Sequence, residues 1–336
     1  MLSRVANSVY WMSRYIERAE NVARMIGVNL QLAIDLPGMT REQWAPMVNV
    51  TGNDEDFVAR YGEYTRDNVL RFLTFDSRNP NSIVSSVRAA RQNARTVREI
   101  ISSEMWEEIN RLYLLTHRPS SRDDAAQAPH EFYQEVKRRS HLIEGTKNET
   151  MPHSEAWHFT RLGRFLERAD QTTRILDVKY FLLLPEVRDV GNPVDDLQWS
   201  AVLRSISAFE PYRKIHGQVL LRNIIDFLLL DRDFPRAVHY SLTSAQTSLH
   251  AITGTPVRHF QHEAERRLGR LVADLDYTNV DEVIRVGLHE FIDSLQLRVI
   301  RVGSAVEADF FGIPEVAASS EEAADVPAGS ALQAQA

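Results

Sequence analysis

Two short stretches of this sequence place a glutamate among arginines in the same register. MSRYIERAEN, at residues 12–21, carries Arg14, Glu17 and Arg18. LGRFLERADQ, at residues 162–171, repeats the pattern 150 residues later as Arg164, Glu167 and Arg168. Guanidinium groups bind carboxylates through paired hydrogen bonds, so these residues could form an ion-pair network or hold an anionic ligand. A glutamate in such a group is also a candidate general acid or base.

The simplest interpretation of the first group is a solvent-exposed helix face. Residues three and four apart are neighbours on a helix, which would pair Arg14 with Glu17 and Glu20 with Arg24. Exposed pairs of this kind are common and contribute little to stability.

The apolar residues on the charged side of the helix argue for burial instead. At about 100° per residue, Tyr10, Met25 and Val28 lie on this side, and Ile175 and Val178 take the last two positions in the second copy. We therefore expect the charged face to pack against its own counterpart or against neighbouring long helices. A structural network is the first interpretation and a ligand site the alternative, because buried Arg–carboxylate clusters more often organise helices.

A second concentration of charge lies in VRAARQNARTVREI. Its arginines, at spacings of three, four and three, share one helix face: Arg88, Arg91, Arg95 and Arg98. Four like charges repel unless acidic side chains, a phosphate or a polycarboxylate lies opposite. The alternative is a solvated arginine face beside Glu99 and Glu104. The corresponding stretch later in the chain, YSLTSAQTSLHAITG, contains no arginine.

The elements that would position these residues are helices. In the first 30 residues, apolar side chains recur at alternating spacings of three and four, which is typical of a long amphipathic helix. Similar periodicity covers residues 65–75, 82–101, 104–115, 131–143, 154–184, 195–207 and most of 217–311. Breakers mark the joints, including the polar stretch from Pro119 to Pro129. Strand-type alternation is almost absent, which predicts an all-α fold.

An internal repeat organises these helices. GEYTRDNVLRFLTFD, at residues 62–76, aligns with GQVLLRNIIDFLLLD, at residues 217–231, and Asp76 and Asp231 are interpreted as turn residues of the two copies. The pattern predicts a duplicated bundle of about a dozen helices, in which Ser3 to Asp35 and Ser154 to Leu184 occupy equivalent central positions. We expect the first repeat in residues 1–150, the second in 151–314 and a disordered acidic tail in 315–336.

Composition limits the classes of function. The chain has 336 residues, a net charge of −7 and an isoelectric point near 5.9, which argues against general nucleic-acid binding. It contains no cysteine, which excludes disulfides, thiolate metal sites and cysteine nucleophiles. No apolar run approaches the ~20 residues of a membrane span, and the N-terminal residues lack a signal-peptide pattern. We therefore expect a cytoplasmic protein without membrane association.

Sequence motifs for metals and nucleotides are missing. His259, His262 and Glu263 form HxxHE, and His289 precedes Glu290, but neither reproduces HExxH or the ExxH pairs of helical di-metal sites. Phosphate-binding loops of the GxxxxGK or GxGxxG type are absent, as is a GxSxG elbow. We expect no metal site and no cofactor.

Several long stretches resemble one known family. MLSRVANSVYWMSRYIERAENVAR, DSRNPNSIVSSVRAARQNARTVRE, EGTKNETMPHSEAWHFTRLGRFLERAD and VGLHEFIDSLQ are similar to the alpha-E family, helical bacterial domains named for an ER motif and typically duplicated in tandem. The likeness extends to about Phe311. TKNETM stands where relatives commonly have an acidic Asp-Ser-Thr-Met, so the resemblance assigns no role to a carboxylate at this place. The resemblance implies a role in a proposed peptide synthesis or modification system, beside ATP-grasp type ligases and transglutaminase-like proteins, and it assigns no catalytic residues.

Three functions follow as hypotheses. The first is an auxiliary protein that binds an ATP-grasp type ligase, a transglutaminase-like protein or an anionic peptide through the arginine face of the first repeat. The second is an enzyme acting on a peptide or amino-acid derivative, with Glu17 or Glu167 as acid or base. The third is a structural scaffold in which the ER residues lock the two repeats together.

Overall fold

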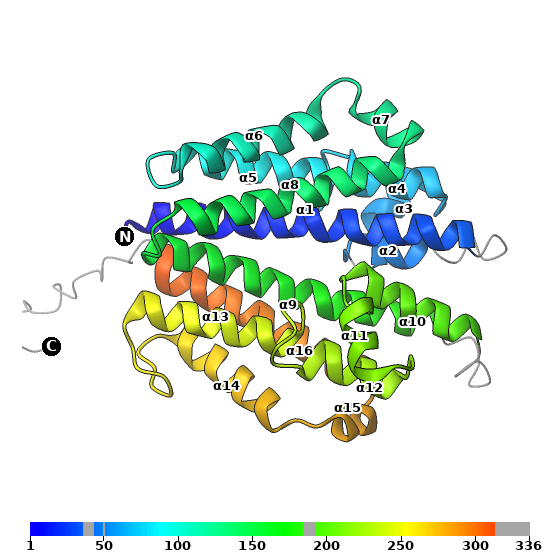
Figure 1. The fold of residues 1–336 in the computed structure, drawn as a ribbon. Coiled ribbons are helices and arrows are strands. Elements are labelled where there is room, and N and C mark those ends of the chain that lie inside the picture. Colours follow the sequence, from blue (N-terminus) through cyan, green and yellow to red (C-terminus); the bar gives the residue numbers. More distant parts are fainter. Residues whose placement is uncertain (36–43, 50, 184–192, 313–336) are drawn as a thin grey trace, which may run out of the picture.

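The computed structural model describes residues 1–35, 44–49, 51–183 and 193–312. Within these residues the chain forms sixteen α-helices, two short π-helical segments and no strand (Figure 1). The predicted all-α fold is confirmed, although a dozen helices was too low a number. The acidic tail expected at residues 315–336 lies outside the described residues.

The helices follow the same order of long and shorter elements in both halves of the chain. The first half contains α1 (Ser3–Asp35), α2 (Ala45–Asn49), α3 (Asp54–Tyr61), α4 (Arg66–Thr74), α5 (Ile83–Thr96), α6 (Ser103–His117), α7 (Ser121–Gln127) and α8 (Pro129–Thr150). The second half contains α9 (Glu155–Leu183), α10 (Pro193–Ser205), α11 (Phe209–His216), α12 (Leu221–Ile225), η2 (Asp226–Leu230), α13 (Val238–Thr253), α14 (Glu263–Tyr277), α15 (Val280–Val286), α16 (Leu288–Val306) and η3 (Glu307–Phe311).

Helices α1 and α9 lie side by side through the centre of the molecule (Figure 1). Helix α1 packs against α5 and α8, and α6 covers that pair. Helix α9 packs in the same way against α13 and α16, and α14 covers that pair. This matched packing is what two related repeats would give, and the boundary between residues 150 and 151 stays a prediction.

The apolar stripe predicted for the first helix forms part of the core. Its members are all buried: Val9, Met12, Ile16, Ala19, Ala23, Ile26 and Leu30. Tyr10, on the charged side, is also fully buried, as expected from its apolar ring. Burying such side chains removes apolar surface from water and stabilises the bundle.

A glycine sets the close approach of the two central helices. A Cβ atom at Gly163 would overlap the backbone carbonyl of Tyr10. Only a residue without a side chain lets the helix backbones come this near, and Arg164 and Arg168 follow within two turns.

The joints between helices differ in how well the sequence predicted them. Asp76 and Asp231 have the expected turn roles, because their Oδ1 atoms accept hydrogen bonds from the N–H groups two residues later, at 2.9 and 2.8 Å. The stretch from Pro119 to Pro129, expected as a polar joint, instead contains helix α7. That prediction was wrong because acidic residues favour the first turn of a helix, and Ala125 gives the segment an apolar contact.

Candidate functional site

The two ER groups exchange their ion pairs between α1 and α9. Glu17 accepts hydrogen bonds from Arg164 at 3.1 Å and from Arg168 at 2.7 and 2.9 Å. Glu167 accepts from Arg14 at 2.9 Å and from Arg18 at 2.6 and 3.0 Å. Each repeat therefore supplies the carboxylate that the arginines of the other repeat require. We call these six residues the ER cluster.

This arrangement decides between the two interpretations of the charged face. Arg14 reaches across to Glu167, so the expected pairing of Arg14 with Glu17 within one helix is wrong. The pair of Glu20 with Arg24 does form, at 2.6 Å. The inference that the face packs against its own counterpart is correct, because the side chains of Glu17 and Glu167 are 2% and 0% exposed.

The electrostatics of the ER cluster keep both glutamates ionised. Burial by itself would raise the pKa of Glu17, but Arg168, Arg164 and Arg236 outweigh that effect and lower the pKa to about 2. Arg18 and Arg14 likewise overcome the burial of Glu167 and lower its pKa to about 2. A carboxylate this acidic, already bonded to two guanidinium groups, is a poor general acid or base near neutral pH.

A set of charges, of which the sequence analysis named only Glu20, extends the ER cluster on one side. Glu20 accepts from Arg236 at 2.6 Å and lies 2.9 Å from His141 Nε2. Further along α8, Glu144 pairs with Lys147 and Arg164. The spacing of His141, Glu144 and Lys147, at three residues each, already places them on one face of α8 and could have signalled this role. Arg236 has no such signal, because it lies in the loop before α13.

The predicted arginine face of the first repeat, which we call the arginine stripe (Arg88, Arg91, Arg95 and Arg98), lies apart from the ER cluster. Arg88 and Arg95 on α5 are exposed, and no ion pair to them forms within the described residues. Arg91 donates to Asn110 at 2.6 Å and its guanidinium lies 4.5 Å from the ring centre of Tyr113 on α6. The structure thus separates the stripe from the ER cluster, since α5 turns its apolar face to α1.

Beside these arginines the surface of α6 is aromatic. Arg98, which follows the end of α5 at Thr96, lies 4.9 Å from the ring centre of Trp106. His117 stacks on Tyr113 with ring centres 4.0 Å apart. Burial and the neighbouring Arg88 and Arg91 lower the pKa of His117 to about 4, so it adds no charge at neutral pH. The expected acidic neighbours Glu99 and Glu104 make no ion pair with the stripe in the described part of the chain.

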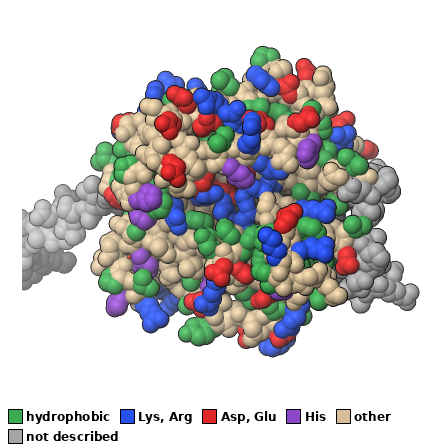
Figure 2. Space-filling view, in the orientation of Figure 1, with side chains coloured by type: hydrophobic (Ala, Val, Ile, Leu, Met, Phe, Trp, Pro, Cys, Tyr) green, Lys and Arg blue, Asp and Glu red, His purple; other side chains and the backbone are tan. Residues whose placement is uncertain are grey.

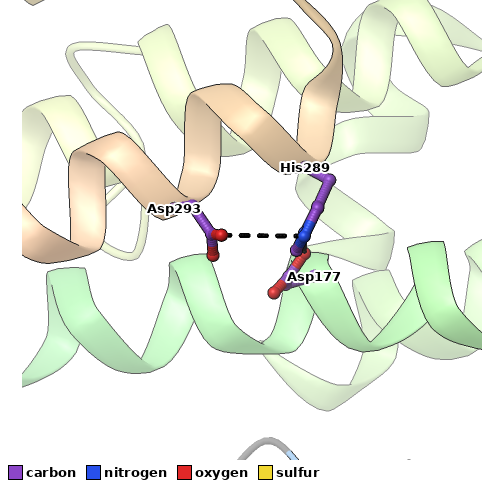
Figure 3. A group of neighbouring side chains, drawn as sticks. All are labelled: Asp177, His289 and Asp293. Atoms are coloured by element: carbon purple, nitrogen blue, oxygen red, sulfur yellow. Dashed lines mark hydrogen bonds and ion pairs between the residues drawn. The ribbon is translucent and has the colours of Figure 1, made fainter.

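One group in the described residues has the composition of a metal site (Figure 3). Asp177 on α9 and His289 and Asp293 on α16 bring one ligand atom each within 4.8 Å of the others. His289 Nδ1 is 2.7 Å from Asp177, and Nε2 is 3.6 Å from Asp293. The hydrogen bond that His289 donates to Asp177 raises the pKa of His289, so the geometry suits a protonated histidine between two carboxylates. Sequence reasoning paired His289 with Glu290 and missed the residue four positions later.

The fold and the reciprocal cluster define a helical protein in which two ER motifs bind each other. Residues 1–311 match the Alpha-E family, described as a predicted α-helical domain with a conserved ER motif. The chain therefore belongs to the Alpha-E family, and its ER dipeptides are Glu17–Arg18 and Glu167–Arg168.

Relatives of the chain include uncharacterised proteins of Mycobacterium bovis and of two strains of Mycobacterium tuberculosis. Each is 25% identical over 271 residues, which make up 75% of this chain and 30% of the relative. The chain thus spans less than a third of the length of these relatives. No solved structure matches it. None of its described helices has the length and apolar character needed to cross a membrane.

Proposed function

We propose that this protein is an auxiliary helical component of a cytoplasmic peptide synthesis or modification system and works with an ATP-grasp type ligase and a transglutaminase-like protein. The observation that carries this proposal is the use of both ER glutamates in ion pairs between the repeats. Because their pKa values lie near 2, these glutamates favour a structural role over acid–base catalysis. The system itself is implied by the family resemblance.

The length of the relatives supports dependence on other protein parts. Most of each mycobacterial relative lies outside the match, so in those proteins the matched region is joined to further sequence.

The arginine stripe is the proposed contact for that partner or for an anionic peptide. Arg88 and Arg95 are exposed without ion-pair partners in the described residues, and Trp106 and Tyr113 lie beside the stripe. Arginine and aromatic side chains are enriched at protein interfaces, and guanidinium groups suit carboxylate recognition. The matched helix of the second repeat, α13, has no arginine and cannot form an equivalent surface.

The test is affinity purification of the tagged protein from its native host. The variants are Arg88→Ala with Arg95→Ala, and, as a control, Arg118→Ala with Arg138→Ala, which removes two exposed arginines on other elements. We expect the wild type and the control to recover the ligase and the transglutaminase-like protein, and the stripe variant to lose at least tenfold of this recovery. Recovery of neither protein by the wild type would contradict the proposed function. Equal recovery by the stripe variant would place the contact elsewhere.

A further inference from the structure

The charge around the ER cluster is unequal on its two sides. On the side of α8, three buried or nearly buried carboxylates form one network with five cations: Glu17, Glu20 and Glu144 with Arg24, Lys147, Arg164, Arg168 and Arg236. On the opposite side, Glu167 and Asp170 face three cations: Arg14, Arg18 and Arg174. Within the described residues, the α8 side thus carries the larger surplus of positive charge. A buried surplus of this kind is costly unless an anion approaches it.

Lys137 adds a further cation to this side. It lies on α8 one turn before His141 and is partly buried. Its ammonium group makes no ion pair or hydrogen bond within the described residues. Burial and the nearby charge of Arg24 lower the pKa of Lys137, against the opposing effect of Glu20. Lys137 therefore lacks the counter-charge that its neighbours on the helix possess.

Lys137 lines a pocket of about 270 Å³. The pocket lies between the C-terminal half of α1, the start of α8, the end of α10 and the start of α11. Ser207 in its wall accepts a hydrogen bond from Arg24, which connects the pocket to the charged network. Figure 2 shows Lys and Arg side chains gathered in a hollow between the upper and lower halves of this face. The volume lies just below the range of about 300–1,000 Å³ that is usual for ligand pockets, which favours a small molecule.

The lining determines which anion would fit. Arg204 joins Lys137 as a second cation, and Glu210 is the acidic residue of the lining. Apart from His130, the two cations and one carboxylate give the described lining one net positive charge. A carboxylate neutralises the net charge of the lining, and inorganic phosphate, which carries more charge at pH 7, is the competing anion in the test below.

The other lining residues indicate the chemistry of the uncharged part of the ligand. Val28, Leu32 and Ala201 offer apolar surface, and Gln31 and Gln134 bring amide groups. Small apolar surfaces with a few amides suit a molecule that carries a short aliphatic side chain and an amide of its own.

We propose that the pocket between α1, α8, α10 and α11 binds a small monocarboxylate of about amino-acid size, with Lys137 as the ion-pair partner and Arg204 at the rim. The site is distinct from the arginine stripe on α5, and this inference does not depend on the proposed partner proteins. The ion pairs of the ER cluster hold the charged network on the α8 side in place, and Arg24 connects this network to the pocket through Ser207.

The test is calorimetric titration of the full chain with N-acetyl-alanine, which combines a carboxylate, an amide and a methyl group. N-acetyl-alaninamide and inorganic phosphate are the comparison probes. The variant is Lys137→Met, and the control is Lys214→Met, which removes an exposed lysine of α11 outside the lining. Urea unfolding of each variant verifies the fold, and Arg204→Gln provides a second variant at the rim.

We expect N-acetyl-alanine to bind the wild type and Lys214→Met alike and its amide to bind at least tenfold more weakly. Lys137→Met should lose at least tenfold in affinity, since hydrogen bonds to charged groups contribute about 1.5–3 kcal/mol and 1.4 kcal/mol is tenfold. Equal binding of acid and amide would overturn the proposal, as would unchanged affinity in both pocket variants or no saturable binding at millimolar concentration. Tighter binding of phosphate that is lost in Lys137→Met would overturn the carboxylate assignment.

Discussion

Replacing Glu167 by glutamine removes one charge from the ER cluster and keeps the side-chain shape. Glu167 is fully buried and accepts hydrogen bonds from Arg14 and Arg18. Glutamine carries no charge and has one acceptor oxygen, so both guanidinium groups lose their counter-charge and at least one of their hydrogen bonds is replaced by an NH2 group facing an N–H. Removing one member of a buried ion pair costs about 3–5 kcal/mol. Because Arg14 keeps the hydroxyl of Tyr10 and Arg18 keeps Asn81, we expect the lower part of that range, about 3 kcal/mol.

Urea unfolding measures this loss directly. The control is Glu107→Gln, because Glu107 is 61% exposed and forms a surface pair with Arg111. Such pairs contribute about 0–1 kcal/mol, so the control should stay within that range. The dependence of free energy on urea should be unchanged in both variants, which would show that the extent of unfolding is the same. A loss in Glu167→Gln within 1 kcal/mol of the control would refute the reasoning.

Three further predictions follow from the same geometry. In urea unfolding, Gly163→Ala should lower the free energy of unfolding by about 1–3 kcal/mol, because its Cβ would overlap the carbonyl of Tyr10. Gly145→Ala, with nothing near its Cβ, should raise the free energy of unfolding by about 0.5–1 kcal/mol. Equal effects of the two substitutions would contradict the close approach of the helices. The pKa values of Glu17 and Glu167 fall from 4.5 to about 2 on folding, so the stability that these carboxylates contribute is complete above pH 4.5 and is lost as the pH falls toward 2. Across this window the melting temperature of the wild type should fall more steeply with decreasing pH than that of Glu167→Gln. Parallel curves of melting temperature against pH would contradict this prediction. Folding raises the pKa of His289 above 6.5, so its hydrogen bond to Asp177 stabilises the protein below pH 6.5, and this stabilisation is lost as the pH rises through the folded pKa. His289→Gln should therefore lower the melting temperature more in mildly acidic than in alkaline buffer. The reverse order would refute this prediction.

The sequence predicted the parts of the fold that repeat locally. Apolar spacing located the buried stripe of α1, and the large residues on the charged side showed that this face is covered. The recurrence of the ER pattern made its own counterpart the natural partner. The turns at Asp76 and Asp231 were also predicted from the sequence, because each side chain accepts a hydrogen bond from the N–H group only two residues later.

Other parts of the site depend on contacts between distant elements. Arg236 reaches Glu20 across 216 positions, and nothing in the local pattern around Arg236 indicates that contact. The pocket at Lys137 requires four helices to meet, so helical periodicity alone does not predict it. The need for a glycine at position 163 could not be predicted either, since only the position of the Tyr10 carbonyl explains why a side chain is excluded.

A double-mutant cycle between Glu17 and Arg168 tests most directly whether the ER motifs bind each other. The variants are Glu17→Gln, Arg168→Met and their combination, and a second cycle pairs Glu17→Gln with Arg118→Met, an exposed residue on another element. Reciprocal pairing predicts a coupling free energy of about 1–3 kcal/mol in the first cycle and less than about 0.5 kcal/mol in the second. Additive losses in the first cycle would contradict the pairing of the two motifs.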